Sequence, residues 1–277
     1  MALTITTNLA SINAQSTLSK SQSNMQKSFA QLSSGSRITK AADDAAGLSI
    51  SETLNSQIRG FTQAKRNAGD GISLVQVAEG GLQEVSNILT RLRELGVQAA
   101  SDTIGDDERG FINKEVQQLK NEVQRIAEST RFGKTRLLDG SGESFEFQVG
   151  IDNDDFQDRI GFDAGGQNVT LDALGIDSFD YSDRDSARES LEVLEQAQTN
   201  VNGQRATLGA IQNRLQSTIN NLDVSVENFS SANSRIRDTD IAESTAELSR
   251  NQILQNASVS VLSQANAAPQ AALRLIG

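Results

Sequence analysis

The stretch that decides the fold is residues 75–99, "VQVAEGGLQEVSNILTRLRELGVQA". Its apolar and small residues recur at alternating steps of three and four, which is the heptad spacing of helices that pack along a narrow seam. The seam positions are Val75, Ala78, Leu82, Val85, Leu89, Leu92, Gly96 and Ala99. Polar residues fill most of the remaining positions, so the pattern predicts a long amphipathic helix that needs partners along one stripe.

Two further segments keep this rhythm, and they lie on either side of a more varied middle region. After a break at "SDTIGDDERG" (101–110), the first continues with Ile112, Val116, Leu119, Val123 and Ile126. The second runs through Leu208, Ile211, Leu215, Ile219, Leu222, Val226 and Phe229. Only one proline occurs in the chain, Pro269, so long uninterrupted helices are permitted. We therefore predict a mainly α protein, a long antiparallel helical bundle or coiled-coil rod. Its seam is expected to include Val75, Leu82, Val85, Leu89, Leu92, Leu215, Leu222 and Val226.

The middle region has a different texture. "SFEFQVG" (144–150) alternates apolar and polar residues with the period of two that is typical of a half-buried strand. "DRIGFDAGG" and "NVTLDALGI" follow, punctuated by glycine. We interpret residues 133–180 as a small patch of β-hairpins attached to the helices.

Composition excludes several classes of function. The chain has no His and no Cys, which removes the Ser-His-Asp and Cys-His nucleophile systems and the usual zinc sites. A net charge of −11 argues against nucleic acid as a partner, because such binding depends on neutralising phosphates. No segment approaches the roughly 20 apolar residues that span a bilayer, and "MALTITTNLASINAQ" does not have the pattern of a secretory signal peptide. We expect no cofactor, no metal and no membrane insertion.

The two ends of the chain pair an apolar stripe with poor helix-forming filler. Residues 1–42 contain no acid and fourteen Ser or Thr, yet Leu18, Met25, Phe29 and Leu32 keep helical spacing. Residues 236–265 look similar, and their apolar stripe includes Ile241, Leu248, Ile253 and Val261. Such segments are not stable helices alone. We therefore predict that these eight residues pack against other copies of the chain.

The first two acids, Asp43 and Asp44, stand side by side in "LSSGSRITKAADDAAGLSIS" (32–51). A carboxylate pair suggests a metal or acid–base site, but adjacent residues on a helix point about 100° apart and do not converge on one ion. Asp is a favoured residue at a helix start, so we interpret the pair as the boundary between the N-terminal arm and the next helix. "DNDDFQD" (152–158) lacks the ligand spacing of a calcium loop and is interpreted as a solvated turn.

Four stretches together resemble bacterial flagellin: the segment 32–51, "QAKRNAGDGISLVQVAEGGLQEV" (63–85), "LRELGVQAAS" (92–101) and "SVLSQANAAPQAALRLIG" (260–277). The resemblance covers roughly residues 1–150 and 195–277. It implies that 1–42 and 234–277 are assembly arms paired in the inner tube of a filament. It also implies that 43–175, with the β-hairpins, and 176–233 form an outer rod, and that one helix continues through Gly69, Gly71, Gly80 and Gly81.

The resemblance also implies partners. Subunits of this family polymerise with themselves, are exported without a cleaved signal peptide through the flagellar channel, and meet an export chaperone, a cap and hook-associated proteins. A Toll-like innate immune receptor reads an arginine, a leucine and a glutamate that match Arg91, Leu95 and Glu115 here. The surrounding stretch departs from the common pattern at Thr90, Leu92 and Gly96, where Gln, Val and Ala are usual.

The sequence thus predicts an extracellular structural subunit of the flagellar filament, which serves motility. A hook–filament junction protein is the nearest alternative, because it shares similar terminal arms. An enzyme that uses carboxylates and Mg²⁺, and a signalling coiled coil of the chemoreceptor type, are alternatives from other classes; the acids do not converge, and no membrane span is seen.

Overall fold

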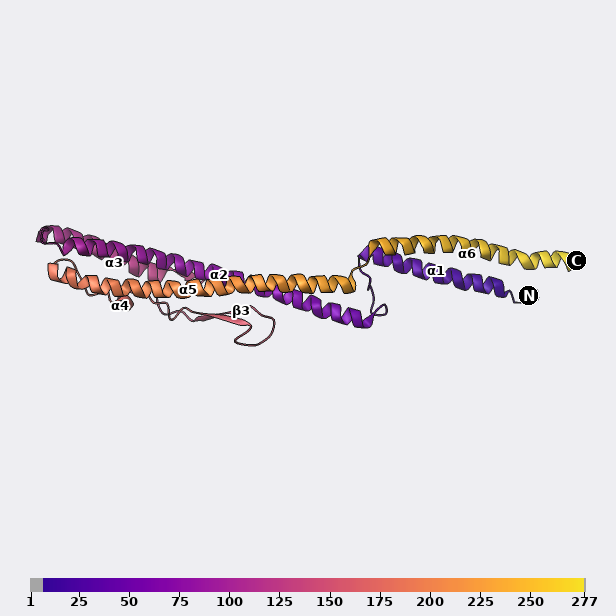
Figure 1. Cartoon of the computed structure of the whole chain (residues 1–277), viewed down its shortest axis with the longest axis horizontal. Helices are drawn as coiled ribbons and strands as arrows, with labels where there is room; N and C mark the ends of the chain where they lie inside the picture. Colours follow the sequence, from indigo (N-terminus) through magenta and orange to yellow (C-terminus); the bar gives the residue numbers. More distant parts are fainter. Residues whose placement is uncertain (1–6, 277) are drawn as a thin grey trace. The chain divides into compact units, whose positions relative to one another are not determined.

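The computed structural model describes residues 7–276, with side chains described as far as residue 267 (Figure 1). The helices are α1 (Leu9–Ser34), α2 (Ala45–Ala99), α3 (Asp106–Ser129), α4 (Leu171–Leu174), α5 (Arg184–Arg237) and α6 (Ile241–Ile276). The strands are β1 (Arg131–Phe132), β2 (Thr135–Arg136), β3 (Ser144–Gln148) and β4 (Arg159–Asp163). The mainly α fold with a small antiparallel β component is as predicted.

The chain forms two compact units. The terminal unit comprises Met1–Ser56 and Asn228–Gly277, and the central unit comprises Gln57–Glu227. Both α2 and α5 contribute to each unit, because the divisions at 56/57 and 227/228 fall inside these helices.

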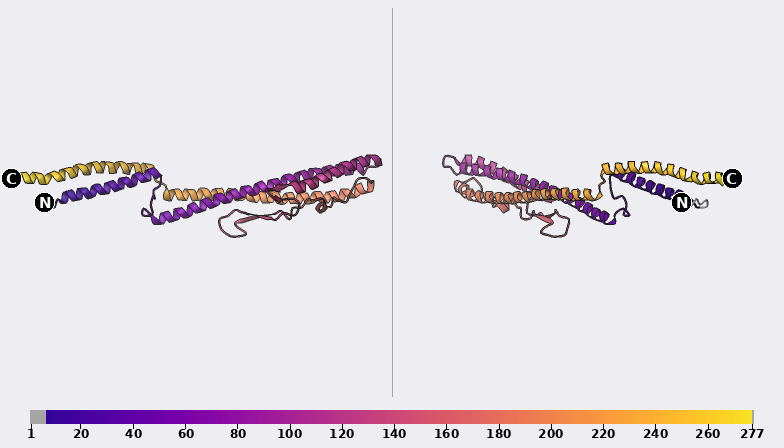
Figure 2. Two further views of the ribbon diagram at one scale, coloured as in Figure 1. Left: turned by 180° about the vertical axis from the view of Figure 1, so that it is seen from behind. Right: turned by 45° about the vertical axis from the view of Figure 1, so that its right-hand side comes forward.

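The central unit is a bundle of α2, α3 and α5, in which α2 and α5 run antiparallel (Figures 1 and 2). Its core is the heptad stripe of α2, with Val75, Leu82, Val85, Leu89 and Leu92 fully buried. On α5 the matching stripe includes Leu194, Val201, Leu208 and Leu215, all at most 1% exposed. Leu222 is also buried, and Val226, next to the end of the central unit at Glu227, is half-buried.

Glycine positions in α2 let other elements approach the helix closely. A Cβ at Gly81 would lie 2.7 Å from Leu138 Cδ1, and one at Gly96 would lie 3.0 Å from Tyr181 Oη. The buried Tyr181 hydroxyl donates a hydrogen bond to the carbonyl of Leu92 at 2.9 Å. Gly96 therefore makes room for an aromatic anchor, and α2 continues unbroken through its glycines from residue 45 to residue 99.

The β component consists of two separate hairpins. β1 pairs with β2 around Gly133, and β3 pairs with β4 in a register that places Phe145 opposite Phe162. The strand predicted at "SFEFQVG" is β3, but the prediction of hairpins as far as residue 180 is wrong. Thr170 caps the short helix α4 by accepting a hydrogen bond from the Ala173 N–H, and Gly175 ends it in the left-handed conformation.

The terminal unit contains α1 and α6 side by side, together with the connection between α1 and α2. Gly35 ends α1 with φ +69°, and the connection is fixed to the chain between α5 and α6. Arg37 N–H donates to the Arg237 carbonyl at 2.6 Å, and Thr239 N–H donates to the Gly35 carbonyl at 3.1 Å. The Arg37 guanidinium adds a 2.8 Å hydrogen bond to the Ile236 carbonyl. The junctions of both arms are therefore tied together by backbone.

Candidate assembly surfaces

The seam between α1 and α6 is built from small residues. Ala14, Ser21 and Ser28 are buried on α1, and Ser244 and Ser258 are buried on α6. Their spacing is seven or a multiple of seven, so they form one heptad position on each helix. Small side chains let the two helices approach closely but bury little apolar surface, so the seam alone contributes modest hydrophobic stabilisation.

The larger apolar residues of the arms lie at the edge of this seam or point away from it. Of the eight predicted packing residues, Leu18, Met25, Leu32 and Leu248 are half-buried. The other four are largely exposed: Phe29 at 66%, Ile241 at 66%, Ile253 at 68% and Val261 at 56%. Further exposed apolar residues of the arms, which the sequence pattern did not single out, are Leu9, Ile12, Leu254 and Val259.

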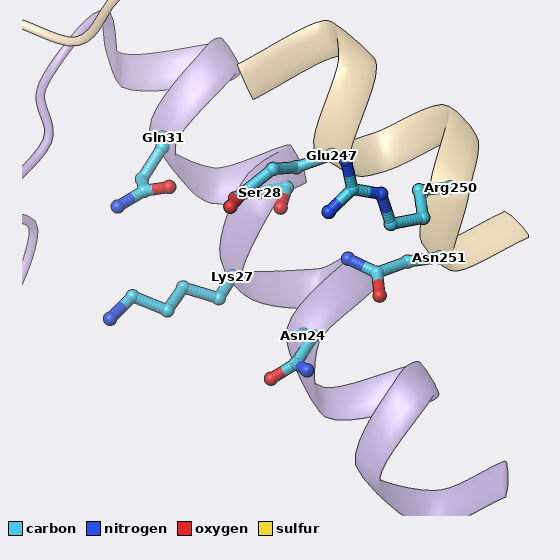
Figure 3. A pocket seen from close by; sticks show the side chains of 7 residues that line it. All are labelled: Asn24, Lys27, Ser28, Gln31, Glu247, Arg250 and Asn251. Atoms are coloured by element: carbon cyan, nitrogen blue, oxygen red, sulfur yellow. The ribbon is translucent and has the colours of Figure 1, made fainter. Parts of the chain in front are cut away.

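Two hollows lie along the α1–α6 pair. A polar one of about 410 Å³ is lined by side chains that include Lys27, Gln31, Glu247 and Arg250 (Figure 3). A second, of about 300 Å³, is lined by Ala10, Asn13, Ala14, Thr17, Leu254, Ala257, Ser258 and Val261. The arms therefore present both a charged and a largely apolar recess beside the exposed apolar residues.

Asp43 and Asp44 lie directly before α2, which starts at Ala45. Asp44 accepts a hydrogen bond from the Gly47 N–H at 2.9 Å at the start of α2. Asp43 faces back to the α1 side, where it forms an ion pair with Lys27 at 3.0 Å and accepts hydrogen bonds from Thr39 and Lys40. The Lys27 ammonium, with the Thr39 hydroxyl and the Lys40 N–H, lowers the pKa of Asp43 to about 2. The prediction of a helix start is confirmed.

No group of three or more acidic residues in the part of the chain that the structure describes is arranged to hold a metal ion. Over the same residues, none of the helices combines the length and apolar character that crossing a bilayer requires.

The three residues predicted to meet an innate receptor lie in different environments. Arg91 forms ion pairs with Glu94 at 3.0 Å and with Glu115 at 2.9 Å, on the surface of α2 and α3. These carboxylates, Glu94 foremost, raise the pKa of Arg91. Leu95 is only 2% exposed and packs in the core. Arg91 and Glu115 thus share one surface, whereas the Leu95 side chain lies beneath it.

Sequence comparison places these surfaces in a known context. Residues 5–143 match the bacterial flagellin N-terminal helical region, and residues 191–276 match the bacterial flagellin C-terminal helical region. The chain belongs to the bacterial flagellin family. Flagellin from Halalkalibacterium halodurans is 41% identical over 97% of this chain and 98% of its own length. The flagellar filament core protein flaB2 of Brachyspira hyodysenteriae is 40% identical over 98% of this chain and 99% of its own length.

A solved structure also shows the likeness. The crystal structure of Bacillus cereus flagellin is 31% identical, with a TM-score of 0.51 over 57% of this chain and 88% of that chain. These flagellin relatives include filament core proteins, and membership of the family makes this chain a structural subunit of the extracellular bacterial flagellar filament rather than an enzyme. None of these relatives favours the hook–filament junction alternative.

Proposed function

We propose that the chain polymerises by covering the exposed apolar residues of α1 and α6 with neighbouring copies. The observation that carries this proposal is the division of the arms into a seam of small residues and an outward set of large ones. In this assignment 1–42 and 234–277 form the inner tube. Residues 43–175 and 176–233 form the outer rod, in keeping with the family resemblance.

The energetic argument is one of unequal burial. Fully burying a Leu, Ile, Val or Phe side chain contributes about 1.5–3 kcal/mol. Phe29, Ile241, Ile253 and Val261 are mostly exposed in a single copy, so most of this contribution is still to be gained. Serine, threonine and asparagine are moderate helix formers, so arms rich in them gain their order chiefly from packing. Folding of the arms and assembly of the filament are therefore coupled.

The exposed apolar residues of α6 also suggest a need for accessory proteins that cover them before assembly. Before assembly an apolar α6 is a surface that associates non-specifically, and a chaperone that covers it would prevent this. We propose that an export chaperone holds 234–277, and that the chain leaves through the flagellar export channel without a cleaved signal peptide. The cap and hook-associated proteins then meet the ends of the filament.

Recognition by a Toll-like innate immune receptor is a further part of the proposal. Arg91 and Glu115 lie on one exposed surface and would contact the receptor directly. Leu95 would act indirectly, by packing in the core and so holding α2 in place, because its side chain is buried. The monomer is expected to activate a receptor reporter, and Arg91→Ala is expected to weaken activation at unchanged helicity. A monomer without reporter activity would contradict this part.

Substituting a polar residue for one exposed apolar residue on α1 and one on α6 tests the polymerisation proposal. Phe29→Ser and Ile253→Ser should leave the monomer's circular dichroism nearly unchanged, because both side chains are exposed. Each should raise the critical concentration for polymerisation at least tenfold, since about 1.4 kcal/mol of lost burial is a factor of ten. Val97→Ser, at an apolar position outside the arms that is 59% exposed, is the matched control. Normal filaments from both arm variants would refute the proposal.

A further inference from the structure

The hairpin loop between β3 and β4 displays a single aromatic ring to solvent. Phe156 is 89% exposed, the highest value among the exposed large apolar residues of the described chain. The connection beyond β3 bulges away from the helices in Figure 1, although Ile151 near its base packs against Gly60 of α2. We call residues 149–158 the Phe156 loop. An aromatic side chain held in water in this way is typical of a contact anchor.

Hydrogen bonds within the Phe156 loop hold its backbone in one conformation. Asp154 accepts hydrogen bonds from the N–H groups of Phe156 at 2.9 Å and Gln157 at 2.8 Å. The buried Asp158 accepts from the Asp154 N–H at 3.1 Å, and its N–H bonds back to the Asp154 carbonyl. These bonds hold the backbone of the loop at Phe156, so a partner would not have to order the loop before binding.

A second surface of the central unit has complementary chemistry. The β1–β2 hairpin carries Arg131, Lys134 and Arg136 and no acid. Beside it lies a hollow of about 460 Å³, which we call the basic hollow; it is lined by Lys134, Thr135, Arg136, Ser141, Gly142 and Glu143. The Phe156 loop carries four acids, of which Asp155 pairs with Arg159 and both Asp154 and the buried Asp158 accept N–H groups within the loop. The exposed Asp152 is therefore the carboxylate that the loop offers to a partner. At the hollow, Arg136 already forms an ion pair with Asp139 at 3.2 Å and Glu143 contributes a carboxylate, so the Lys134 ammonium is the cation that a partner would meet. The Phe156 ring and the Asp152 carboxylate fit it through cation–π contact and an ion pair.

The two surfaces are held too far apart to meet within one chain. Ile151 packs against Gly60 of α2, where a Cβ would lie 2.7 Å from Ile151 Cγ2. Thr130, directly before β1, and Leu138, directly beyond β2, both pack against Gly81 of the same helix. At 1.5 Å per residue, Gly60 and Gly81 are about 30 Å apart along α2. The surfaces can therefore pair only between copies.

We propose that the Phe156 loop of one subunit docks into the basic hollow of a second copy, displaced by about 30 Å along the direction of α2. The occupant is a copy of this chain because members of the family self-assemble, so each subunit repeatedly meets others. Two different patches that meet in this way form a heterologous contact, and a contact of that kind propagates into an open filament when its rotation does not close a ring. The contact adds to the packing of the arms and does not depend on it.

Charge reversal tests the contact. Asp152→Lys and Lys134→Glu alter exposed side chains, so each monomer should keep its circular dichroism spectrum. Each is expected to raise the critical concentration of the full chain several-fold at low salt, with a smaller effect near 1 M salt, where charges are screened within about 3 Å. The double variant restores an opposite-charge pair and should recover most of the loss. Phe156→Ala should raise the critical concentration about tenfold at either salt concentration.

Cross-linking gives a second, geometric test, which the absence of cysteine from the sequence makes clean. A disulfide requires Cα atoms within about 7 Å, so Gln157→Cys with Thr135→Cys should cross-link copies in filaments and give no intrachain bond in dilute monomer. Gln157→Cys with Arg214→Cys is the control pair and should remain unlinked. Single reversals without effect, a double variant no better than the singles, or filaments without the cross-link would each overturn the proposal. Filaments that still form in these cases would leave assembly through the arms standing.

Discussion

Two adjacent glycines in α2 stand in opposite surroundings. No described atom beyond the helix's own neighbouring backbone would lie within 4 Å of a Cβ added at Gly80, whereas one at Gly81 would meet Leu138 Cδ1 at 2.7 Å and Thr130 Oγ1 at 2.8 Å. Leu138 is fully buried and has no room to move aside. Gly80→Ala should stabilise the monomer by about 0.5–1 kcal/mol because glycine is a poor helix former. Gly81→Ala should destabilise it by about 1–3 kcal/mol through overpacking. Urea denaturation of the two variants measures both, and equal effects would contradict the packing seen here.

The ionisation of Asp43 gives a prediction about pH. Its pKa of about 2 lies below the ordinary 3.8, so the Lys27, Thr39 and Lys40 contacts favour the fold when the carboxylate is charged. This contribution is present above about pH 4 and is lost as the pH falls toward 2. Carbon-13 NMR of the monomer should show Asp43 titrating near 2. Lys27→Met should move the pKa of Asp43 toward 3.8, whereas Lys27→Arg should leave it low; an unchanged value in Lys27→Met would exclude the ion pair as the main cause.

At Asp43, Asp44 and Leu95 the sequence predicts only those interactions that form within a few residues along the chain. The role of Asp44 at a helix start follows from the chemistry of capping, which operates within a few residues. The attachment of Asp43 to Lys27 does not follow, because it depends on how α1 and the connection fold back on each other. For the same reason the burial of Leu95 beneath Arg91 could not be told from the matching motif alone.

At the scale of elements, the periodicity of apolar residues predicts which segments form the long helices. The heptad stripes of residues 75–99, 112–126 and 208–229 fall in α2, α3 and α5 because each helix buries one continuous face. Periodicity does not establish that α2 passes through its glycines; the family resemblance supplied that expectation. The short helix α4 was missed, since "TLDALG" is too short for a helical period and only the capping threonine and the terminal glycine mark it.

The α1–α6 seam supplies a prediction at the same scale. Ser21 is 5% exposed and faces α6 at a position where only small side chains fit. Ser21→Ala should raise the stability of the arm pair by about 0.5 kcal/mol, because alanine is the better helix former. Ser21→Leu should lower it by about 1–3 kcal/mol, because the helices would have to separate. Hydrogen exchange of α1 amides reports both changes locally. Slower exchange in the leucine variant would show that the seam is not tightly packed.

Across the whole molecule, the same apolar pattern serves two purposes that the sequence does not separate. Leu18 and Phe29 keep the same helical spacing, yet Leu18 is half-buried beside α6 and Phe29 is 66% exposed. In the central unit the equivalent stripe is buried within one chain. Which residues remain for neighbours depends on what a single copy already covers, and that is a property of the folded chain.

Removal of residues 236–277 tests whether the central unit folds by itself while the arms are needed for assembly. The central unit has its own core, fully buried in α2, α3 and α5, so the truncated chain should remain a folded, partly helical monomer. It should not polymerise, because α1 loses its partner helix and the exposed residues of α6 are gone. Circular dichroism should show a loss confined to the arms, with a cooperative thermal transition for the remainder, and negative-stain microscopy should show no filaments at concentrations where the full chain forms them. Adding back the separate 236–277 peptide should not restore filaments, because the peptide carries Arg237 and Thr239 but is no longer joined covalently to α5, so it must bind from solution to re-form the junction of the arms. Filaments from the truncated chain would show that the central unit alone carries assembly, and that the small-residue seam and the exposed apolar residues beside it serve another purpose.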